Sequence, residues 1–311
     1  MQYRQLGRTG LNISVMSYGA SPLGSVFRDI DESEGIRTVH AALDLGINFI
    51  DVSPYYGLTK AETVLGKALK GVPRDRYFLE TKVGRYGAEI EDIDFSAERV
   101  TVSVDESLAR LGVEYVDIIQ CHDVEFGDLD QVVNETIPAL RKLQKQGKVR
   151  FVGVTGLPLE VFRYVLDRVD VDAILSYCHY ALNDTALADL VPAVQEKGVG
   201  IISASVLGMG LLTERGLPEW HPAPPDVVET CQRAAAYCRR QGVDIAQLAI
   251  QYALAYPGVA TTLVGTANPK NIEKNVRWME TPIDEELLAE VLAILEPVHN
   301  KTWPSGRAEN N

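Results

Sequence analysis

Four side chains in the first half of the chain have the types needed to move a proton to or from a carbonyl or alcohol oxygen. Asp51 ends the apolar run INFID, and Tyr56 follows it in the segment VSPYYG. Lys82 ends the run YFLETK, and His122 ends the run VDIIQCH. Because each follows an apolar, strand-like run, the four residues are candidates for one shared site.

The proposed chemistry depends on how these groups would change one another's charge. A tyrosine phenol has a pKa of about 10, too high for a base near neutrality, but a nearby ammonium such as Lys82 would lower it. A buried lysine needs a carboxylate to stay charged, and Asp51 could provide one. His122 could hydrogen-bond a substrate oxygen and orient the reacting carbon. Together the four residues would interconvert carbonyls and alcohols.

Each of these residues taken alone has a plainer explanation. An acid at a strand end often caps a helix or pairs with a base, a lysine there is usually solvated, and a single histidine is usually structural. The combination is informative only if the three strand ends meet in space. Tyr55, beside Tyr56, is expected to be a packing or rim residue.

The elements that would bring these ends together alternate along the whole chain. Apolar runs rich in β-branched residues alternate with helical patterns of period near 3.6, in which Val100, Val104 and Leu108 share one face. No G-x-G-x-x-G follows any run, which counts against an open dinucleotide-binding sheet. The pattern favours a parallel (β/α)8 TIM barrel over residues 1–311 as a single domain. The expected strands are 15–21, 47–51, 77–82, 116–122, 149–155, 173–177, 199–205 and 259–265.

Several features lie outside this alternation or mark its boundaries. An N-terminal β-hairpin is expected before the barrel, and an extra C-terminal helix (284–296) and tail after it. The Gly- and Pro-rich segment 207–227 is a candidate lid or a solvated loop. The expected N-caps are Ser33, Ser96, and Asn183 or Asp184. The glycines expected to end helices are Gly46, Gly112, Gly147 and Gly198.

Composition limits the partners and the compartment. Of the 311 residues, 46% are hydrophobic and 23% charged, as in ordinary globular proteins. The net charge of −13 argues against nucleic acid or an anionic membrane as a partner. The four cysteines fit no zinc-binding or redox spacing, so we expect reduced thiols and no metal site. Without a signal peptide or membrane-spanning run, a cytoplasmic protein is expected. The sequence does not predict an oligomeric state.

The segments FIDVSPYYG, ETKVG and IIQCHD resemble the motifs of the aldo-keto reductases, which are (β/α)8 oxidoreductases that use a nicotinamide cofactor. The resemblance implies that Tyr56 is the acid/base, that Lys82 and Asp51 tune it, and that His122 orients the substrate. The segments INFIDVSPYYG, ILSYCHYALND and NKTWPSG resemble a narrower branch of that family. This implies oxidation of L-galactose or a closely related aldose at C1 to the aldonolactone, a step of plant ascorbate synthesis.

The same resemblance implies a set of cofactor-binding residues at the carboxyl ends of the strands. They are Gly19, Ala20, Thr155, Tyr177, Ser205, Leu207, Gly208, Gly265, Thr266, Asn271 and Asn275. Gly156, Tyr177 and Ala204 depart from the Asn, Gln and aromatic residues of many relatives. Ala267 and Asn271 stand where NADP-preferring relatives carry basic side chains, and a 2′-phosphate needs such partners. The segment therefore predicts NAD as the cofactor, with the orientation of Lys270 left open.

Sugar hydroxyls need polar partners, and the candidates are Ser21, Arg85, Asp123, His179 and Trp303. Each also has a structural explanation, since Asp123 could pair with Arg85, and Trp303 could pin the tail to the barrel. Two alternative functions remain from the residues alone. One is a general NADP-dependent aldehyde or ketone reductase, and the other is a non-catalytic cofactor-binding subunit.

Overall fold

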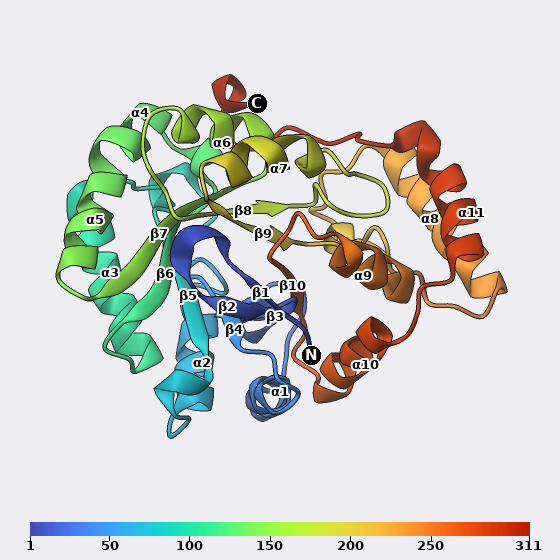
Figure 1. The fold of residues 1–311 in the computed structure, drawn as a ribbon, viewed down its shortest axis with the longest axis horizontal. Coiled ribbons are helices and arrows are strands. Elements are labelled where there is room, and N and C mark those ends of the chain that lie inside the picture. Colours follow the sequence, from blue (N-terminus) through green and yellow to red (C-terminus); the bar gives the residue numbers. More distant parts are fainter.

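The computed structural model describes residues 1–311 and contains the expected closed parallel barrel. Its strands pair in chain order, and β10 closes the ring by pairing with both β9 and β3 (Figure 1). All eight strands predicted from the apolar runs are present, within about three residues of the expected bounds. The barrel strands are β3 (Met16–Gly19), β4 (Phe49–Asp51), β5 (Phe78–Val83), β6 (Val116–Cys121), β7 (Val149–Gly156), β8 (Ala173–Tyr177), β9 (Gly200–Ala204) and β10 (Thr261–Gly265).

Helices cover the outside of the barrel, as the amphipathic patterns predicted (Figure 1). One of them begins with the short helix α4 (Leu129–Gln131) and a π-helical turn at Val132–Thr136 before α5. The other helices between strands, or after the last strand, are α1 (Glu32–Asp44), α2 (Lys60–Leu69), α3 (Ala97–Leu111), α5 (Ile137–Lys145), α6 (Leu159–Leu166), α7 (Leu187–Glu196), α8 (Pro225–Arg240), α9 (Ile245–Ala255), α10 (Pro269–Glu280) and α11 (Glu285–Leu295).

The expected N-terminal hairpin consists of the antiparallel strands β1 (Tyr3–Gln5) and β2 (Asn12–Ser14). Its fully or nearly fully buried residues Leu6, Leu11 and Ile13 join Phe49 and Ile118 in an apolar cluster. Phe49 precedes Asp51 by two residues on the same face of β4, so this apolar layer lies below the strand ends. The hairpin therefore supports the interior from the end opposite the candidate site.

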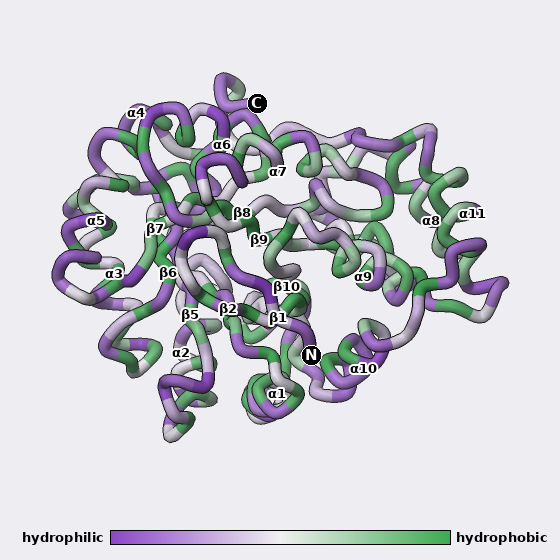
Figure 2. The backbone as a smooth tube through the Cα atoms, viewed as in Figure 1, coloured by the Kyte–Doolittle hydropathy of each residue, from purple (hydrophilic) through white to green (hydrophobic).

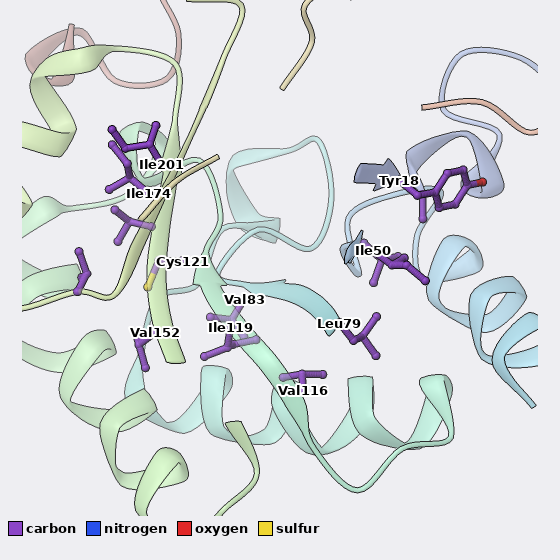
Figure 3. Close-up of a cluster of buried hydrophobic side chains, with 14 of the residues drawn as sticks. Tyr18, Ile50, Leu79, Val83, Val116, Ile119, Cys121, Val152, Ile174 and Ile201 are labelled. Carbon is purple, nitrogen blue, oxygen red and sulfur yellow. The ribbon is translucent and has the colours of Figure 1, made fainter. Parts of the chain in front are cut away.

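The main core lies between the barrel and the helices. Figure 3 shows side chains of this layer, including Ile50, Leu79, Ile119, Val152 and Ile174 from five neighbouring strands. Each of the five is buried, and each alternates along its strand with a residue that faces the interior. The hydropathy along the backbone follows this arrangement, with apolar strands inside and mixed helices outside (Figure 2).

Several details differ from the sequence-based expectations. Asp31, not Ser33, caps α1, because its side chain accepts a hydrogen bond from the backbone N–H of Glu34. Ser33 instead donates to Asp31 at 2.5 Å. Ser96 caps α3 as predicted, by accepting from the backbone N–H of Arg99. The prediction of Asn183 or Asp184 as the N-cap of α7 is wrong, because the helix begins later, with Ala186 at the cap position. Asp184 instead accepts from the backbone N–H of Ala186 in the turn before the helix.

The connection between β9 and β10 contains two helices, α8 and α9, where the sequence indicated one. The extra helix α8 packs against α11, the predicted additional C-terminal helix. The Gly- and Pro-rich loop therefore ends at Pro224, directly before α8. The predicted helix-ending glycines all have left-handed backbones, with φ between 69° and 88°. No helix combines the length and apolar character needed to span a bilayer.

The two serines predicted as N-caps provide a matched test of the helix ends. We expect Ser96→Ala to lower the free energy of unfolding by about 1 kcal/mol, because it removes the side-chain acceptor of the Arg99 N–H at the start of α3. Ser33→Ala should cost less, since Asp31 retains the bond to Glu34. Urea denaturation of both variants measures the difference. Equal losses would contradict the assignment of Asp31 as the cap.

Candidate active site

The structure brings together the four residues predicted to transfer a proton. Asp51 is the last residue of β4, Lys82 lies near the end of β5, and His122 follows β6 directly. All three are almost fully buried, with exposures of 3%, 1% and 3% respectively, and Tyr56 is half-buried in the turn after β4. The four side chains therefore meet at the carboxyl end of the barrel, which is where such barrels carry their active sites.

Lys82 is the centre of this group. Its Nζ atom donates to Oδ1 of Asp51, to the backbone carbonyl of Val52 at 3.0 Å, and to the hydroxyl of Tyr56 at 3.3 Å. An ammonium group has three hydrogens to donate, so all three have an acceptor. The buried charge is thus both hydrogen-bonded and neutralised.

The charge of Lys82 agrees with the expectation from the sequence, but the pKa of Tyr56 does not. Burial disfavours the Lys82 ammonium, but Asp51, Tyr56 and Glu80 together raise the pKa of Lys82 above its ordinary value. Burial raises the pKa of Tyr56, and Lys82 offsets this rise only in part. The expectation of a lowered Tyr56 pKa is therefore wrong, because desolvation of the phenolate outweighs the attraction of Lys82. Tyr56 is a phenol at neutral pH.

His122 is a neutral imidazole. Burial lowers its pKa to about 3, although the neighbouring Asp123 opposes the shift. The rings of Tyr55 and Tyr56 lie nearly perpendicular to it, with centroids 5.7 Å and 5.6 Å away. Ser53 holds its Nδ1 atom at 2.9 Å. The imidazole is therefore fixed beside the Tyr56 ring as an uncharged hydrogen-bonding group.

The turn that carries Tyr56 is held by a close approach of two backbone segments. A Cβ atom on Gly57 would collide with the carbonyl oxygen of Gly24, and one on Gly24 would collide with the backbone of Tyr56. Gly57 also has a left-handed backbone, with φ of 63°. Because only glycine fits both positions, the loop after β3 locks the turn, and with it Tyr56.

Arg85 and Asp123 form an ion pair at the mouth of the barrel. The guanidinium donates to Asp123 at 2.5 Å and lies 4.2 Å above the ring of Tyr55 and 4.1 Å from that of Phe126. Asp123 has a left-handed backbone that Thr155 stabilises, since its hydroxyl accepts from the Asp123 N–H and donates to the Asp123 carboxylate. The expected structural role of Asp123, an ion pair with Arg85, is therefore confirmed.

Glu125 is a central residue that the sequence did not single out. It is fully buried, and its Oε1 accepts from the Tyr177 hydroxyl, the Leu157 N–H and the Ser305 hydroxyl at 3.0–3.1 Å. Burial raises its pKa to about 8, with Asp123 adding to the rise. Glu125 stands in the segment VEFGD, which contains no recognisable motif. Only the fold shows that its carboxyl group links the C-terminal tail to the ends of β7 and β8.

Glu125 also accounts for two departures from the family pattern. A Cβ atom on Gly156 would lie 3.0 Å from Oε2 of Glu125 and 2.8 Å from a methyl group of Val161. A side chain as large as asparagine therefore does not fit there. Tyr177 in turn donates its hydroxyl to the same carboxyl group. The third departure, Ala204, ends β9 and is half-buried.

The remaining candidates for substrate binding are more widely spread. Ser21 begins the short turn after β3 and is half-buried. His179 is buried after β8 and its Nδ1 lies 3.1 Å from Asp184. Trp303 is 7% exposed and packs edge-on against His221, with centroids 5.3 Å apart. Hydrogen bonds and ring contacts tie His179 and Trp303 to loop residues and not to Lys82 or Tyr56.

Most of the predicted cofactor residues lie at the ends of β9, β10 and β3 or on α10, whereas Thr155 and Tyr177 lie at the ends of β7 and β8. Gly19 and Gly265 are cross-strand partners, and a Cβ on Gly265 would lie 3.2 Å from the Gly19 carbonyl oxygen. A side chain at Gly265 would also press on Pro22 at 3.3 Å, so the glycine allows the ends of these strands to pack closely. Ala20 and Thr266 continue these strands, while Ser205, Leu207 and Gly208 form a tight turn after β9 in which the Gly208 N–H donates to the Ser205 carbonyl.

Helix α10 follows the end of β10. The Thr266 hydroxyl accepts from the Asn268 N–H at 3.1 Å and from the Asn271 side chain at 3.4 Å, and Asn275 is buried on the same helix. Lys270 is exposed and forms no ion pair, whereas Lys274 lies 3.5 Å from Asp244. Glycine-lined backbone, neutral amides and a helix N-terminus are suited to a dinucleotide, so these residues fit the implied nicotinamide cofactor.

Comparison with known proteins agrees with this geometry. A sequence model described as "Aldo/keto reductase family" matches residues 15–296. The chain is 54% identical to L-galactose dehydrogenase of Arabidopsis thaliana, over 100% of this chain and 99% of the relative. It is 30% identical to D-threo-aldose 1-dehydrogenase of a Pseudomonas species, over 91% and 94% of the two chains. The structure resembles an aldo-keto reductase of Bacillus halodurans in its holo form, with a TM-score of 0.79, 29% identity and 98% coverage of both chains.

The raised pKa of Glu125 predicts a pH-dependent contribution to stability. A carboxyl group whose pKa is higher in the folded than in the unfolded protein stabilises the fold fully at acidic pH, and that contribution is lost as pH rises towards 8. The loss is at most about 1.4 kcal/mol per pH unit for one group. The free energy of unfolding of the Glu125→Gln variant should therefore fall less between pH 5 and pH 8 than that of the wild type, as measured by urea denaturation. Parallel pH dependences of the two proteins would contradict this prediction.

Proposed function

The chain belongs to the aldo/keto reductase family, and we propose that it oxidises an aldose at C1 to the aldonolactone, with L-galactose as the preferred sugar and NAD as the cofactor. The observation that carries the proposal is the single Lys82 ammonium that donates to both Asp51 and Tyr56 at the barrel mouth. The choice of sugar is supported by the full-length similarity to L-galactose dehydrogenase.

A nicotinamide cofactor held by residues such as Gly265, Thr266 and Asn271 would supply the acceptor for the hydride from C1 of the sugar. The protein's own part is to remove the proton of the C1 hydroxyl and to hold the oxygen in place. We assign proton removal to the oxygen of Tyr56 in its phenolate form, which the Lys82 ammonium at 3.3 Å stabilises. Asp51 keeps Lys82 charged through this step, because removing the carboxylate would leave a cation in an almost fully buried position.

In this proposal the sugar is positioned by His122 and by the ion pair of Arg85 and Asp123. The uncharged imidazole lies beside Tyr56 and hydrogen-bonds the oxygen on C1. Arg85 and Asp123 offer the hydroxyls further along the sugar a donor and an acceptor, and both are already held by each other and by Thr155. Because these groups are fixed before the sugar binds, less ordering is needed on binding.

The preference for NAD rests on the charges near the start of α10. In the helix's first turn Lys270 is the only basic side chain, and the residues around it, Ala267 and Asn271, are uncharged. A 2′-phosphate is best bound by two or more positively charged donors. The exposed, unpaired Lys270 is the residue through which NADP would be expected to bind if the proposal is wrong.

We predict that Tyr56→Phe lowers kcat by about 10² to 10⁴-fold, because it removes the group that accepts the proton. Affinity for the reduced cofactor, measured by fluorescence titration, should change little. The control is Tyr55→Phe, which removes a neighbouring hydroxyl whose only side-chain contact is with Arg85 at 3.3 Å. It should retain kcat within about tenfold. A Tyr56→Phe enzyme with near wild-type kcat would refute the assignment.

A panel of L- and D-aldoses with NAD and NADP tests the proposed reaction and cofactor together. We expect the highest kcat/KM with L-galactose and NAD, measured from the absorbance of the reduced cofactor. Lys270→Ala should leave the NAD values unchanged. Equal or higher efficiency with NADP, lost in Lys270→Ala, would refute the cofactor preference, and activity confined to simple aldehydes would refute the proposed substrate.

A further inference from the structure

Ser53 lies two residues after Asp51, at the start of the turn that carries Tyr56, and its side chain contacts the imidazole of His122. Its side chain is fully buried, with 0% exposure. Its Oγ atom lies 2.9 Å from Nδ1 of His122 and accepts a hydrogen bond from the backbone N–H of Tyr55 at 3.1 Å. The hydroxyl forms no other hydrogen bond within the protein.

These two contacts distinguish between the two neutral forms of the imidazole. If Nδ1 carried the proton, it would donate to Oγ, and the buried hydroxyl hydrogen of Ser53 would have no acceptor. If Nδ1 is unprotonated, Ser53 donates to it, so that the Ser53 hydroxyl hydrogen and the Nδ1 lone pair both have a partner and only Nε2–H is left for a ligand. An unsatisfied buried donor costs about 1–3 kcal/mol, which favours the second arrangement.

The second arrangement places the imidazole proton on Nε2. The nearest carboxylate oxygen, Oδ2 of Asp123, is 3.7 Å from Nε2, which is too far for a hydrogen bond. Nε2 is therefore the ring nitrogen that remains for a ligand. Burial also lowers the pKa of His122 to about 3, so only the neutral forms compete near neutrality.

We propose that Ser53 is a positioning residue that holds His122 as its Nε2–H tautomer, so that the imidazole donates to the oxygen on C1 and leaves that oxygen's proton for Tyr56. The identity of the oxygen rests on the proposed function, whereas the tautomer does not. In the opposite tautomer, the Nε2 lone pair would face the sugar and accept the C1 hydroxyl proton. That hydrogen bond would turn the proton away from Tyr56.

The tautomer can be measured directly by nitrogen NMR of the protein labelled with ¹⁵N-histidine. The chain has five histidines, so the spectrum is simple, and the His122→Asn variant identifies the signals of interest. We expect wild-type His122 to carry its proton on Nε2 alone. Ser53→Ala should show a mixture of both tautomers, and Ser53→Thr, which keeps the hydroxyl, should restore the wild-type pattern.

The same variants have a kinetic signature. We expect Ser53→Ala to lower kcat by about 3- to 10-fold with a smaller change in KM, which is the size of effect expected from one buried hydrogen bond, and Ser53→Thr to recover most of it. In the His122→Asn background, Ser53→Ala should have no further effect on kcat. Ser17→Ala is the control, because Ser17 is also fully buried but bonds Ser14 and Thr261.

Each outcome has a distinct meaning. Wild-type His122 protonated on Nδ1, or a Ser53→Ala enzyme with unchanged tautomer and kcat, would overturn the proposal. A loss of kcat in Ser53→Ala that Ser17→Ala reproduces would also overturn it. If Ser53→Ala does not fold, the wild-type and Ser53→Thr spectra still decide the tautomer. An Nε2–H signal in a protein without activity on any aldose would refute the proposed function and leave the role of Ser53 in fixing the tautomer intact.

Discussion

The buried ammonium of Lys82 is the feature on which the rest of the site depends. A cation at 1% exposure is stable only with a carboxylate beside it and an acceptor for each hydrogen, and the ends of β4 and β5 provide both. The parallel register aligns Asp51 with Glu80, so Lys82 lies two residues further along β5, towards Tyr56. The Gly24 and Gly57 backbones then hold Tyr56 over Lys82.

Burial also limits how many other groups at the site can be charged. Burial and the adjacent Asp51 raise the pKa of Glu80 well above its usual value, and burial lowers the pKa of His122 to about 3. The ionised groups are thus the pairs Lys82 with Asp51 and Arg85 with Asp123. At the site each cation is paired with one carboxylate, and the neutral Tyr56 and His122 remain as the groups that can exchange or direct a proton.

Much of this arrangement could be predicted from the sequence because the signals are local. Apolar runs predict the strands, and a polar residue at the end of each run predicts the site once the barrel closes. The pKa of Tyr56 could not be predicted, since its direction depends on how much water the fold removes. Glu125 could not be found either, because Tyr177, Leu157 and Ser305 lie 32 to 180 residues away in the chain. The cap of α1 was misassigned because Asp31 and Ser33 are both good capping residues.

The central claim is that Lys82 makes the half-buried Tyr56 a usable base. The pH dependence of kcat/KM for aldose oxidation in the wild type and in Lys82→Met tests it most directly. Because the phenolate form increases with pH and the pKa of Tyr56 is raised, wild-type kcat/KM should rise about tenfold per pH unit from neutrality into the alkaline range. Loss of the ammonium should move the rise to still higher pH and lower the rate at every pH. A wild-type plateau beginning near neutrality, or the same profile in both proteins, would contradict the claim.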